Sequence, residues 1–394
     1  MTSVKRWLLP DGVEDILPSE AHKLESLRRE LLDLLESWGY ELVIPPLIEF
    51  LDSLLVGASE DLDLHTFKVT DQVSGKMMGI RADVTLQAAR IDAHSLNREG
   101  QVRLCYADNV LHTRPRGIMT SRVPIRLGAE LYGHASTAAD VELICLMVQT
   151  LRSAGIPGVQ IVLGHVGIFK ALVSEARLNE EAESQLFEAV QRKAYDEIDL
   201  LLDNKVQDSA LKQQFKELIR LSGDESVLAR AQEAFAAASA AVSAELNELN
   251  DIVHGVKRRL GEIDLHFDLC ELRGYEYHTG IVFAAYTNEY GRAVAKGGRY
   301  DQLGKAFGRA RPASGFDTDL KVLAQLSERA FARPRGILAP DSDEPSLTLK
   351  VSDLRSQGEK VVTLLGTEDV ANVDVSTMYC DRRLIKRDAA WTVE

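Results

Sequence analysis

Apolar residues recur along the chain at two spacings, one typical of helices and one typical of strands. From residue 20 to residue 39 they fall at positions 24, 27, 31, 34, 35 and 38, which is the spacing of one helix face, and Gly39 stands at the expected stop. Segment 125–133 instead alternates apolar residues with Arg126 and Glu130. This alternation predicts a strand with one apolar and one charged face.

The pattern of helices and strands indicates the fold class. A helix is predicted from Asp83, its cap, to residue 93, and residues from about 171 to 262 are almost purely helical because Glu, Ala, Leu, Lys and Gln dominate them. Strands surrounded by helices, without repeated βαβ units, predict an α+β fold with an antiparallel sheet flanked by helices. Shorter strands are predicted at 40–43, 65–69, 77–81 and 102–106.

Prolines and polar residues indicate a boundary near the C-terminal end. The segment 330–345 carries Pro334, Pro340 and Pro345 among charged residues, which predicts a linker. We therefore expect a domain over 1–329, carrying the helical insertion of about 171–262. A small α/β domain is expected over 346–394, with a strand at 346–351, a helix, and a strand at 360–365.

Composition and charge exclude several classes of protein. The 394 residues include 60 acidic and 46 basic ones, a net charge of −14, which argues against broad binding to nucleic acid or anionic lipid. Four distant cysteines without a CxxC pair argue against a zinc knuckle, a dithiol site or a disulfide framework. No apolar stretch approaches the roughly 18 residues of a membrane span. We expect a cytoplasmic protein with reduced thiols.

Ordinary catalytic and cofactor motifs are missing from the sequence. It contains no GxxxxGK[ST], no GxGxxG after a strand, no HExxH and no GxSxG. The nine histidines lack ligand spacing, so we expect no metal and no cofactor, and we interpret a lone histidine such as His165 as structural.

Four segments concentrate polar side chains in patterns that suggest a binding site. Segment 79–85 places Arg81, Asp83 and Thr85 at alternate positions, so that all three are expected to project the same way from a strand end. Arg126 and Glu130 share one strand face. The other two segments are 271–280, which holds Arg273, Tyr277 and His278, and 296–301, a glycine turn with an arginine. Taken singly, each segment also fits a solvated strand face with internal ion pairs.

Together these segments resemble histidyl-tRNA synthetase. Residues 9–18 are similar to the start of that family, and 38–49 resemble its dimer-forming motif 1. Segment 79–85 is similar to its R-P-E-G-T, and 127–133 resemble the end of motif 2. The resemblance extends from residue 8 to about 325. Its two histidine-specific motifs, R-G-L-D-Y-Y and G-G-R-Y-D, are matched by Arg273-Gly-Tyr-Glu-Tyr-His-Thr-Gly280 and Gly297-Gly-Arg-Tyr-Asp301.

The departures from the synthetases fall on the side that would bind ATP. Class II synthetases hold the triphosphate with arginine forks in motifs 2 and 3. Here His112 occupies the motif 2 arginine position, and Lys321 and Val322 occupy the Glu-Arg pair of motif 3. This combination resembles the regulatory subunits of ATP phosphoribosyltransferase, a paralogous family.

The resemblance implies a noncatalytic subunit of the first step of histidine biosynthesis. Such a subunit activates a short-form ATP phosphoribosyltransferase catalytic subunit, mediates feedback inhibition by histidine, and contains a dimer core, expected here at 38–50. Arg126 stands where a Gln usually contacts histidine, and His278 replaces a tyrosine. The implied effector site consists of Asp83, Thr85, Arg126, Glu130, Arg273, Tyr277 and His278, with no catalytic residue.

Two other functions remain open at this point. The first is an active histidine–tRNA ligase with unusual motifs, which histidine-dependent ATP–pyrophosphate exchange would reveal. The second is a module that binds histidine or tRNA without any part in phosphoribosyl transfer. Its nucleic-acid contact would be a small basic loop, Arg114, Arg116, Arg122 and Arg126.

Overall fold

A computed structural model describes residues 7–57, 60–115, 117, 120–272, 274–275, 277–366 and 368–394. The chain divides into two compact units, Met1–Arg329 and Ala330–Glu394.

The first unit is built on a mixed, mainly antiparallel sheet of nine strands. The central neighbours β5, β6, β12, β11, β10 and β7 are all antiparallel, whereas β1 and β9 add in parallel to β5 and β7. The predicted α+β class is confirmed. In sheet order the strands are β1 Glu41–Leu42, β5 Val102–Asn109, β6 Ile125–Tyr132, β12 Ala313–Asp319, β11 Tyr290–Arg299, β10 Ile281–Thr287, β7 Gln160–His165, β9 Leu265–Asp268 and β8 Ser222–Gly223.

Helices cover this sheet where the apolar spacing predicted them. Helix α1 (Pro18–Ser37) begins with a proline at its first position and buries Leu27, Leu31 and Leu35. Helix α5 (Thr137–Ser153) is capped by the Ser136 hydroxyl and packs on β12. The helix predicted at 83–93 runs as α4 (Thr85–Arg90) and a π-helical turn, Ile91–Leu96. Two short helices lie near the sheet, α12 Leu320–Leu326 and the 3-10 turn Leu303–Phe307.

A small second sheet carries the segment that resembles motif 1. Strand β2 (Ile48–Phe50) pairs with β4 (Met77–Ile80), which pairs in turn with β3 (Phe67–Thr70). Short helices α2 (Leu51–Leu54) and α3 (Glu60–His65) connect these strands.

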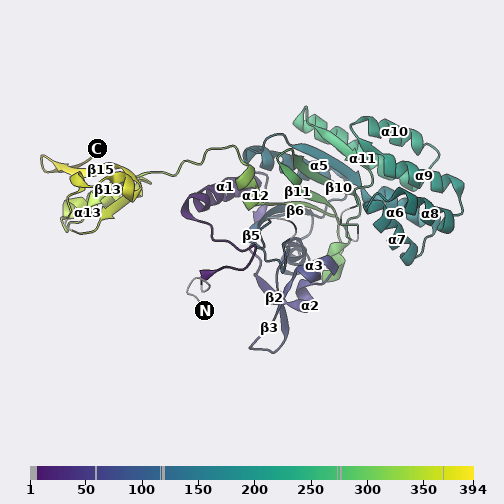
Figure 1. Ribbon diagram of the computed structural model, residues 1–394, viewed down its shortest axis with the longest axis horizontal. Coiled ribbons are helices and arrows are strands. Elements are labelled where there is room, and N and C mark those ends of the chain that lie inside the picture. The colour runs from purple at the N-terminus through teal and green to yellow at the C-terminus, as the bar shows by residue number, and fades with distance from the viewer. Residues whose placement is uncertain are drawn as a thin grey trace. The chain divides into compact units, whose positions relative to one another are not determined.

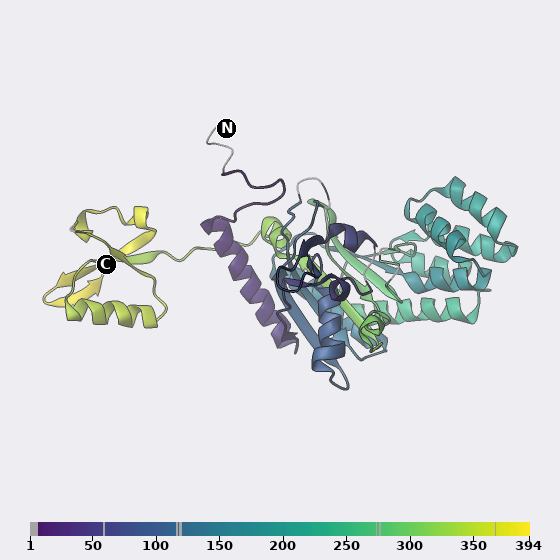
Figure 2. The ribbon, with the colours of Figure 1, turned by 90° about the horizontal axis from the view of Figure 1, so that it is seen from below.

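The helical insertion gathers beyond the β10 side of the sheet, as the teal helices of Figure 1 and Figure 2 show. Strand β8 (Ser222–Gly223) interrupts the helices of the insertion and pairs with β9, which ties the insertion to the main sheet. The helices are α6 Val166–Ala176, α7 Glu180–Gln191, α8 Tyr195–Lys205, α9 Ser209–Arg220, α10 Ser226–Ala234 and α11 Ala240–Leu260.

The second unit differs in two places from the expected linker and first strand. Residues 336–340, inside the predicted linker, form strand β13 (Gly336–Pro340), because Ile337, Leu338 and Ala339 make an apolar run that is completely buried. Residues 346–351 belong to a helix instead of a strand, since Pro345 begins it and Leu347 and Leu354 recur on its buried side. In chain order the remaining elements are α13 Pro345–Ser356, β14 Val361–Leu364, 3-10 turns Val370–Asn372 and Val375–Met378, β15 Cys380–Arg387 and β16 Ala390–Val393.

No helix in the described part of the chain is both long and apolar enough to cross a membrane. All four cysteines are buried as free thiols.

Candidate functional site

A cavity of about 530 Å³ lies in the first unit, against the strands of the main sheet and the beginning of α4. Segments far apart in the sequence supply its walls. Asp83, Thr85, Glu130, Tyr277 and His278, five residues of the site implied by the resemblance, line it together. Arg273 lies outside the described residues. Among those described, Arg126 is not part of the cavity wall.

Glu130 forms the buried floor of the cavity. It lies within β6 opposite Gly315 of β12, where a β-carbon would overlap the Glu130 carboxylate, so only glycine leaves room for it. The Tyr106 hydroxyl donates to Glu130 Oε1 at 3.0 Å, and the Tyr300 hydroxyl donates to Oε2. Burial raises the pKa of Glu130 to about 8, although these hydroxyl donors act in the opposite direction. The carboxyl group is therefore poised to change charge near neutral pH.

Asp83 and Thr85 face the same cavity from the start of α4. The Thr85 backbone N–H donates to Asp83 Oδ1 at 2.7 Å, and this bond fixes the carboxylate beside the helix. The hydroxyls of Thr85 and Tyr106 lie 3.3 Å apart. Because Tyr106 donates its hydrogen to Glu130, its oxygen is left to accept from Thr85, which links Thr85 to the cavity floor.

Arg81 does not project with Asp83 and Thr85, so that part of the alternation argument is wrong. Strand β4 ends at Ile80, and Val84 already has helical backbone angles, so the two-residue period of a strand stops before it reaches the site. The buried Arg81 guanidinium donates at 2.8 Å to the carbonyl oxygens of Asn109 and Pro45. Arg81 therefore holds the framework and does not face the cavity.

Arg126 pairs with Asp317 and not with Glu130. Asp317 lies on β12 and lines the cavity, and Asp319 is the direct neighbour of Arg126 across the two strands. Burial acts to lower the pKa of Arg126, but the carboxylates of Asp317, Asp319 and Asp83 raise it above its ordinary value. Arg126 consequently remains charged and neutralises Asp317 at the edge of the cavity.

Tyr277 and His278 form the opposite wall. Their ring centroids are 4.3 Å apart, His278 is buried, and Tyr277 is partly exposed at the mouth. Lys170 of α6 donates to the His278 carbonyl at 2.6 Å, which holds this loop against the insertion. A β-carbon at Gly298 would lie 2.8 Å from His278 Nε2, so the second glycine of the G-G-R-Y-D motif admits the imidazole.

Arg299 and Tyr300 of the G-G-R-Y-D motif lie at the end of β11 and directly after it, and they contact different parts of the protein. Arg299 is buried away from the cavity, where it donates to Asp140 of α5 at 2.5 Å, and Ser314 donates to the same carboxylate at 2.7 Å. Tyr300 faces the cavity and binds Glu130. Sequence reasoning did not assign Tyr106, Tyr300 or Asp317 to the site, although Tyr300 belonged to a motif that had been recognised.

The segment that corresponds to motif 2 of the synthetases makes hydrogen bonds within the protein. His112 is buried, with its Nε2 3.0 Å from the Ala82 carbonyl oxygen. Arg122 donates to the carbonyls of His112 and Asp11, so it ties the N-terminal segment to this loop. Of the remaining basic-loop residues, Arg114 is exposed and Arg116 lies outside the described residues.

Comparison with known proteins decides the family. A family model described as histidyl-tRNA synthetase matches residues 12–323, and one described as the ATP phosphoribosyltransferase subunit HisZ C-terminal domain matches residues 334–394. The ATP phosphoribosyltransferase regulatory subunits of Ectopseudomonas mendocina and Marinobacter nauticus are 52% and 51% identical to the chain over 394 residues, covering 100% of it and 99% of each relative. The chain belongs to the ATP phosphoribosyltransferase regulatory subunit family.

Solved structures agree with this family and with the class II synthetase-like fold. A structure titled as an ATP phosphoribosyltransferase regulatory subunit/histidyl-tRNA synthetase from Bacillus halodurans has a TM-score of 0.81 and 27% identity, with 96% of this chain and 97% of that one covered. Histidyl-tRNA synthetase from Nostoc sp. PCC 7120 has a TM-score of 0.75 at 19% identity, covering 93% of this chain and 87% of that one, which is a likeness of fold.

The raised pKa of Glu130 gives a prediction about the stability of this regulatory-subunit fold. The folded state binds a proton at Glu130 more tightly than the unfolded state, so this stabilisation is complete below about pH 4.5 and is lost as the pH rises through about 8. Glu130→Gln cannot titrate, and its single amide oxygen can still accept from one of the two tyrosine hydroxyls. The measurement is urea unfolding at pH 5, 7 and 9. The free energy of unfolding of the variant, relative to that of the wild type, should rise by a few kcal/mol between pH 5 and pH 9.

Glu142→Gln is the matched control for this experiment. Arg103 donates to both Glu142 oxygens, at 2.8 and 2.9 Å. Burial acts to raise the pKa of Glu142, but the bonds from Arg103 and Tyr40 lower it below its ordinary value. Its stabilising contribution is therefore present above about pH 4.5 and fades in acid, which is the opposite trend. Parallel pH curves for the wild type and Glu130→Gln would contradict the assignment.

Proposed function

We propose that this chain is a noncatalytic regulatory subunit that activates a short-form ATP phosphoribosyltransferase catalytic subunit and mediates feedback inhibition by histidine. The reaction concerned is the first step of histidine biosynthesis. The observation that carries this proposal is the 52% identity to a named regulatory subunit over the whole chain, C-terminal domain included.

The cavity supports histidine as the effector. An α-ammonium group is recognised by carboxylates. Asp83 lines the cavity with the Thr85 hydroxyl, and a bound ammonium group would favour the ionised form of Glu130, which also lines it. The rings of Tyr277 and His278, tilted by 43° to each other, give an aromatic surface on which an imidazole ring can pack. Arg273 is proposed from the resemblance as the partner of the α-carboxylate. The cavity of about 530 Å³ is in the range of small-ligand pockets.

The same cavity argues against adenylate formation. Its edge towards β12 carries Asp317, whose charge is already neutralised by Arg126, and a buried imidazole occupies the motif 2 arginine position. No arginine occupies the motif 3 position either, since Val322 lies there in α12. The motif 2 and motif 3 positions therefore offer no guanidinium fork to a triphosphate, and Arg126 is already paired with Asp317.

We therefore expect no histidine-dependent exchange of pyrophosphate into ATP. The purified chain should remain at the background of a reaction without protein, while an authentic histidyl-tRNA synthetase assayed alongside gives exchange. Detection of histidyl-adenylate would overturn the noncatalytic assignment.

We also propose that segment 38–50 forms a homodimer core. Five apolar side chains of this segment are exposed in the single chain, so they do not fill its own core. Exposed apolar groups that gather in one place mark interaction surfaces. These residues are Leu42, Ile44, Leu47, Ile48 and Phe50.

Co-purification tests the partner directly. The chain, expressed together with a short-form ATP phosphoribosyltransferase catalytic chain, should elute with it at constant ratio. The acidic charge leads us to propose that no nucleic acid is bound. The free thiols lead us to propose a cytoplasmic location for the complex. Recovery of tRNA in place of the catalytic chain would favour the RNA-binding alternative.

A further inference from the structure

His165 is a buried histidine with unsatisfied nitrogens. It is the last residue of β7 and is completely inaccessible to solvent. Within the described residues, neither of its ring nitrogens has a hydrogen-bond partner. A neutral imidazole carries one N–H donor and one nitrogen acceptor, and leaving both unused in the interior costs free energy. A ligand bound to a ring nitrogen would remove this cost.

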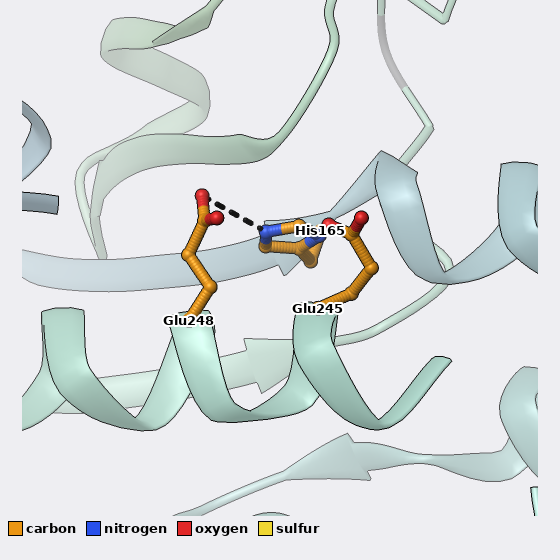
Figure 3. A group of neighbouring side chains, drawn as sticks. All are labelled: His165, Glu245 and Glu248. Carbon is orange, nitrogen blue, oxygen red and sulfur yellow. Dashed lines mark ion pairs between the residues drawn. The ribbon is translucent and has the colours of Figure 1, made fainter. Parts of the chain in front are cut away.

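Two carboxylates flank this ring from one helix. Glu245 and Glu248 lie one turn apart on α11, on the side that faces β7, and Figure 3 shows their carboxylates on either side of His165. The distance from His165 Nδ1 to Glu245 Oε2 is 3.4 Å, and that from Nε2 to Glu248 Oε1 is 3.6 Å. One donor atom of each residue can be chosen so that all three lie within 4.8 Å.

These separations suit metal coordination better than direct hydrogen bonds. Hydrogen bonds from N–H to oxygen span about 2.7–3.2 Å. Zinc lies about 2.0–2.1 Å from an imidazole nitrogen and about 2.0–2.2 Å from a carboxylate oxygen, so two tetrahedral ligands are roughly 3.4 Å apart. The observed gaps of 3.4 and 3.6 Å are thus wide enough to admit one such ion between a nitrogen and an oxygen.

The surroundings supply both the charge and an entry path. A neutral His165 with two ionised glutamates would place two negative charges in a small volume. The nearby Arg299 already pairs with Asp140, so that negative charge is only partly offset. The side chains of Glu245 and Glu248 are 31% and 34% exposed, whereas the imidazole lies at the buried end. A cation can consequently enter from solvent past the carboxylates.

We propose that His165, Glu245 and Glu248 form a binding site for a divalent transition-metal ion of the zinc class. An imidazole with two carboxylates selects such ions over Mg²⁺ or Ca²⁺, which prefer all-oxygen sites. The ion takes one ring nitrogen and the nearer carboxylate. The other glutamate reaches it by side-chain rotation, which its partly exposed end allows, and water completes the coordination.

The site joins the main sheet to the helical insertion. His165 ends β7 of the sheet, and α11 is the last helix of the insertion, so a shared ion would fasten the two together. Among the described residues, none of the three lines the effector cavity. The proposal is therefore independent of the proposed function. Sequence spacing could not reveal it, because some 80 residues separate the histidine from the glutamates.

Zinc binding to the untagged full chain tests the proposal. After treatment with a chelator, equilibrium dialysis should give one Zn²⁺ per chain at micromolar concentration, with a rise in Tm, and Mg²⁺ should give neither. Glu245→Gln and Glu248→Gln should each weaken Zn²⁺ binding at least 10-fold and remove the rise in Tm. Co²⁺ bound in place of Zn²⁺ should show visible absorption that these variants lose.

Asp264→Asn provides the matched control. Asp264 Oδ1 lies 3.4 Å from Nε2 of His266, the same distance as in the proposed site, but on the surface. Among the described residues, this pair belongs to no three-ligand group. Its substitution should leave Zn²⁺ binding unchanged. Equal Zn²⁺ affinity in all variants would overturn the proposal. Stability that depends on pH without stoichiometric Zn²⁺ binding would also overturn it, because it would show that the site binds only a proton.

Discussion

Glu130→Gln is expected to raise the histidine concentration for half-inhibition of the reconstituted enzyme by about 30-fold. The substitution removes a charge-assisted bond from the effector's ammonium group, worth on the order of 2 kcal/mol. Glutamine keeps the shape of the side chain; its one oxygen can accept from either Tyr106 or Tyr300, and its NH2 group can donate to the hydroxyl oxygen of the other. The loss should therefore come from charge and not from a collapsed cavity.

The measurement is a set of histidine inhibition curves for the complex between this chain and the phosphoribosyltransferase catalytic chain. Glu142→Gln is a suitable comparison, because it removes a half-buried carboxylate that pairs with Arg103 outside the cavity. It should shift half-inhibition by less than about 3-fold. An unchanged inhibition constant in Glu130→Gln would place histidine elsewhere, for example at a subunit interface.

Phe50→Asp is expected to convert a dimer of this chain to monomers at micromolar concentration. Phe50 is exposed in the single chain and ends strand β2, next to the exposed Ile48. In a two-fold interface each substitution occurs twice, and an unpaired carboxylate buried against apolar groups costs several kcal/mol. The dissociation constant should therefore rise at least about 100-fold.

Light scattering or sedimentation velocity distinguishes the two states. Leu200→Asp is the control, because Leu200 is also an exposed apolar residue but lies on α8 of the insertion, far along the chain from segment 38–50. That variant should remain dimeric. A monomeric wild type, or a dimeric Phe50→Asp, would contradict the proposed dimer core.

Much of the fold followed from local patterns. The helical spacing before Gly39 corresponds to α1, whose apolar face packs against the sheet. The alternation around Glu130 corresponds to β6, a strand of that sheet that is buried on both faces over most of its length. Predictions failed where the local sequence pattern favours one secondary structure and the tertiary contacts stabilise another. The apolar residues after Pro345 favour a strand, but the segment is a helix that buries Leu347 and Leu354, two helical turns apart.

Only those residues of the candidate site that belong to recognisable motifs could be predicted from the sequence. Asp83, Thr85 and Glu130 meet in one cavity, and the resemblance had grouped them although they lie on different elements. The same reasoning could not foresee that Arg126 pairs with Asp317, since their contact depends on the register of β6 and β12. It also could not foresee that Tyr106 and Tyr300 both donate to Glu130, because the spacing of residues in the sequence does not reveal which hydroxyl groups meet across a sheet.

The rate of phosphoribosyl transfer by a short-form catalytic chain, measured with and without this chain, tests the central claim most directly. The proposed function predicts that adding the chain raises the rate, and that histidine lowers it again with a dependence that Glu130→Gln weakens. An effector coupling of about 1–3 kcal/mol corresponds to a 5- to 150-fold response. A catalytic rate that is the same in its presence and absence, at concentrations where both chains co-purify, would contradict the regulatory role.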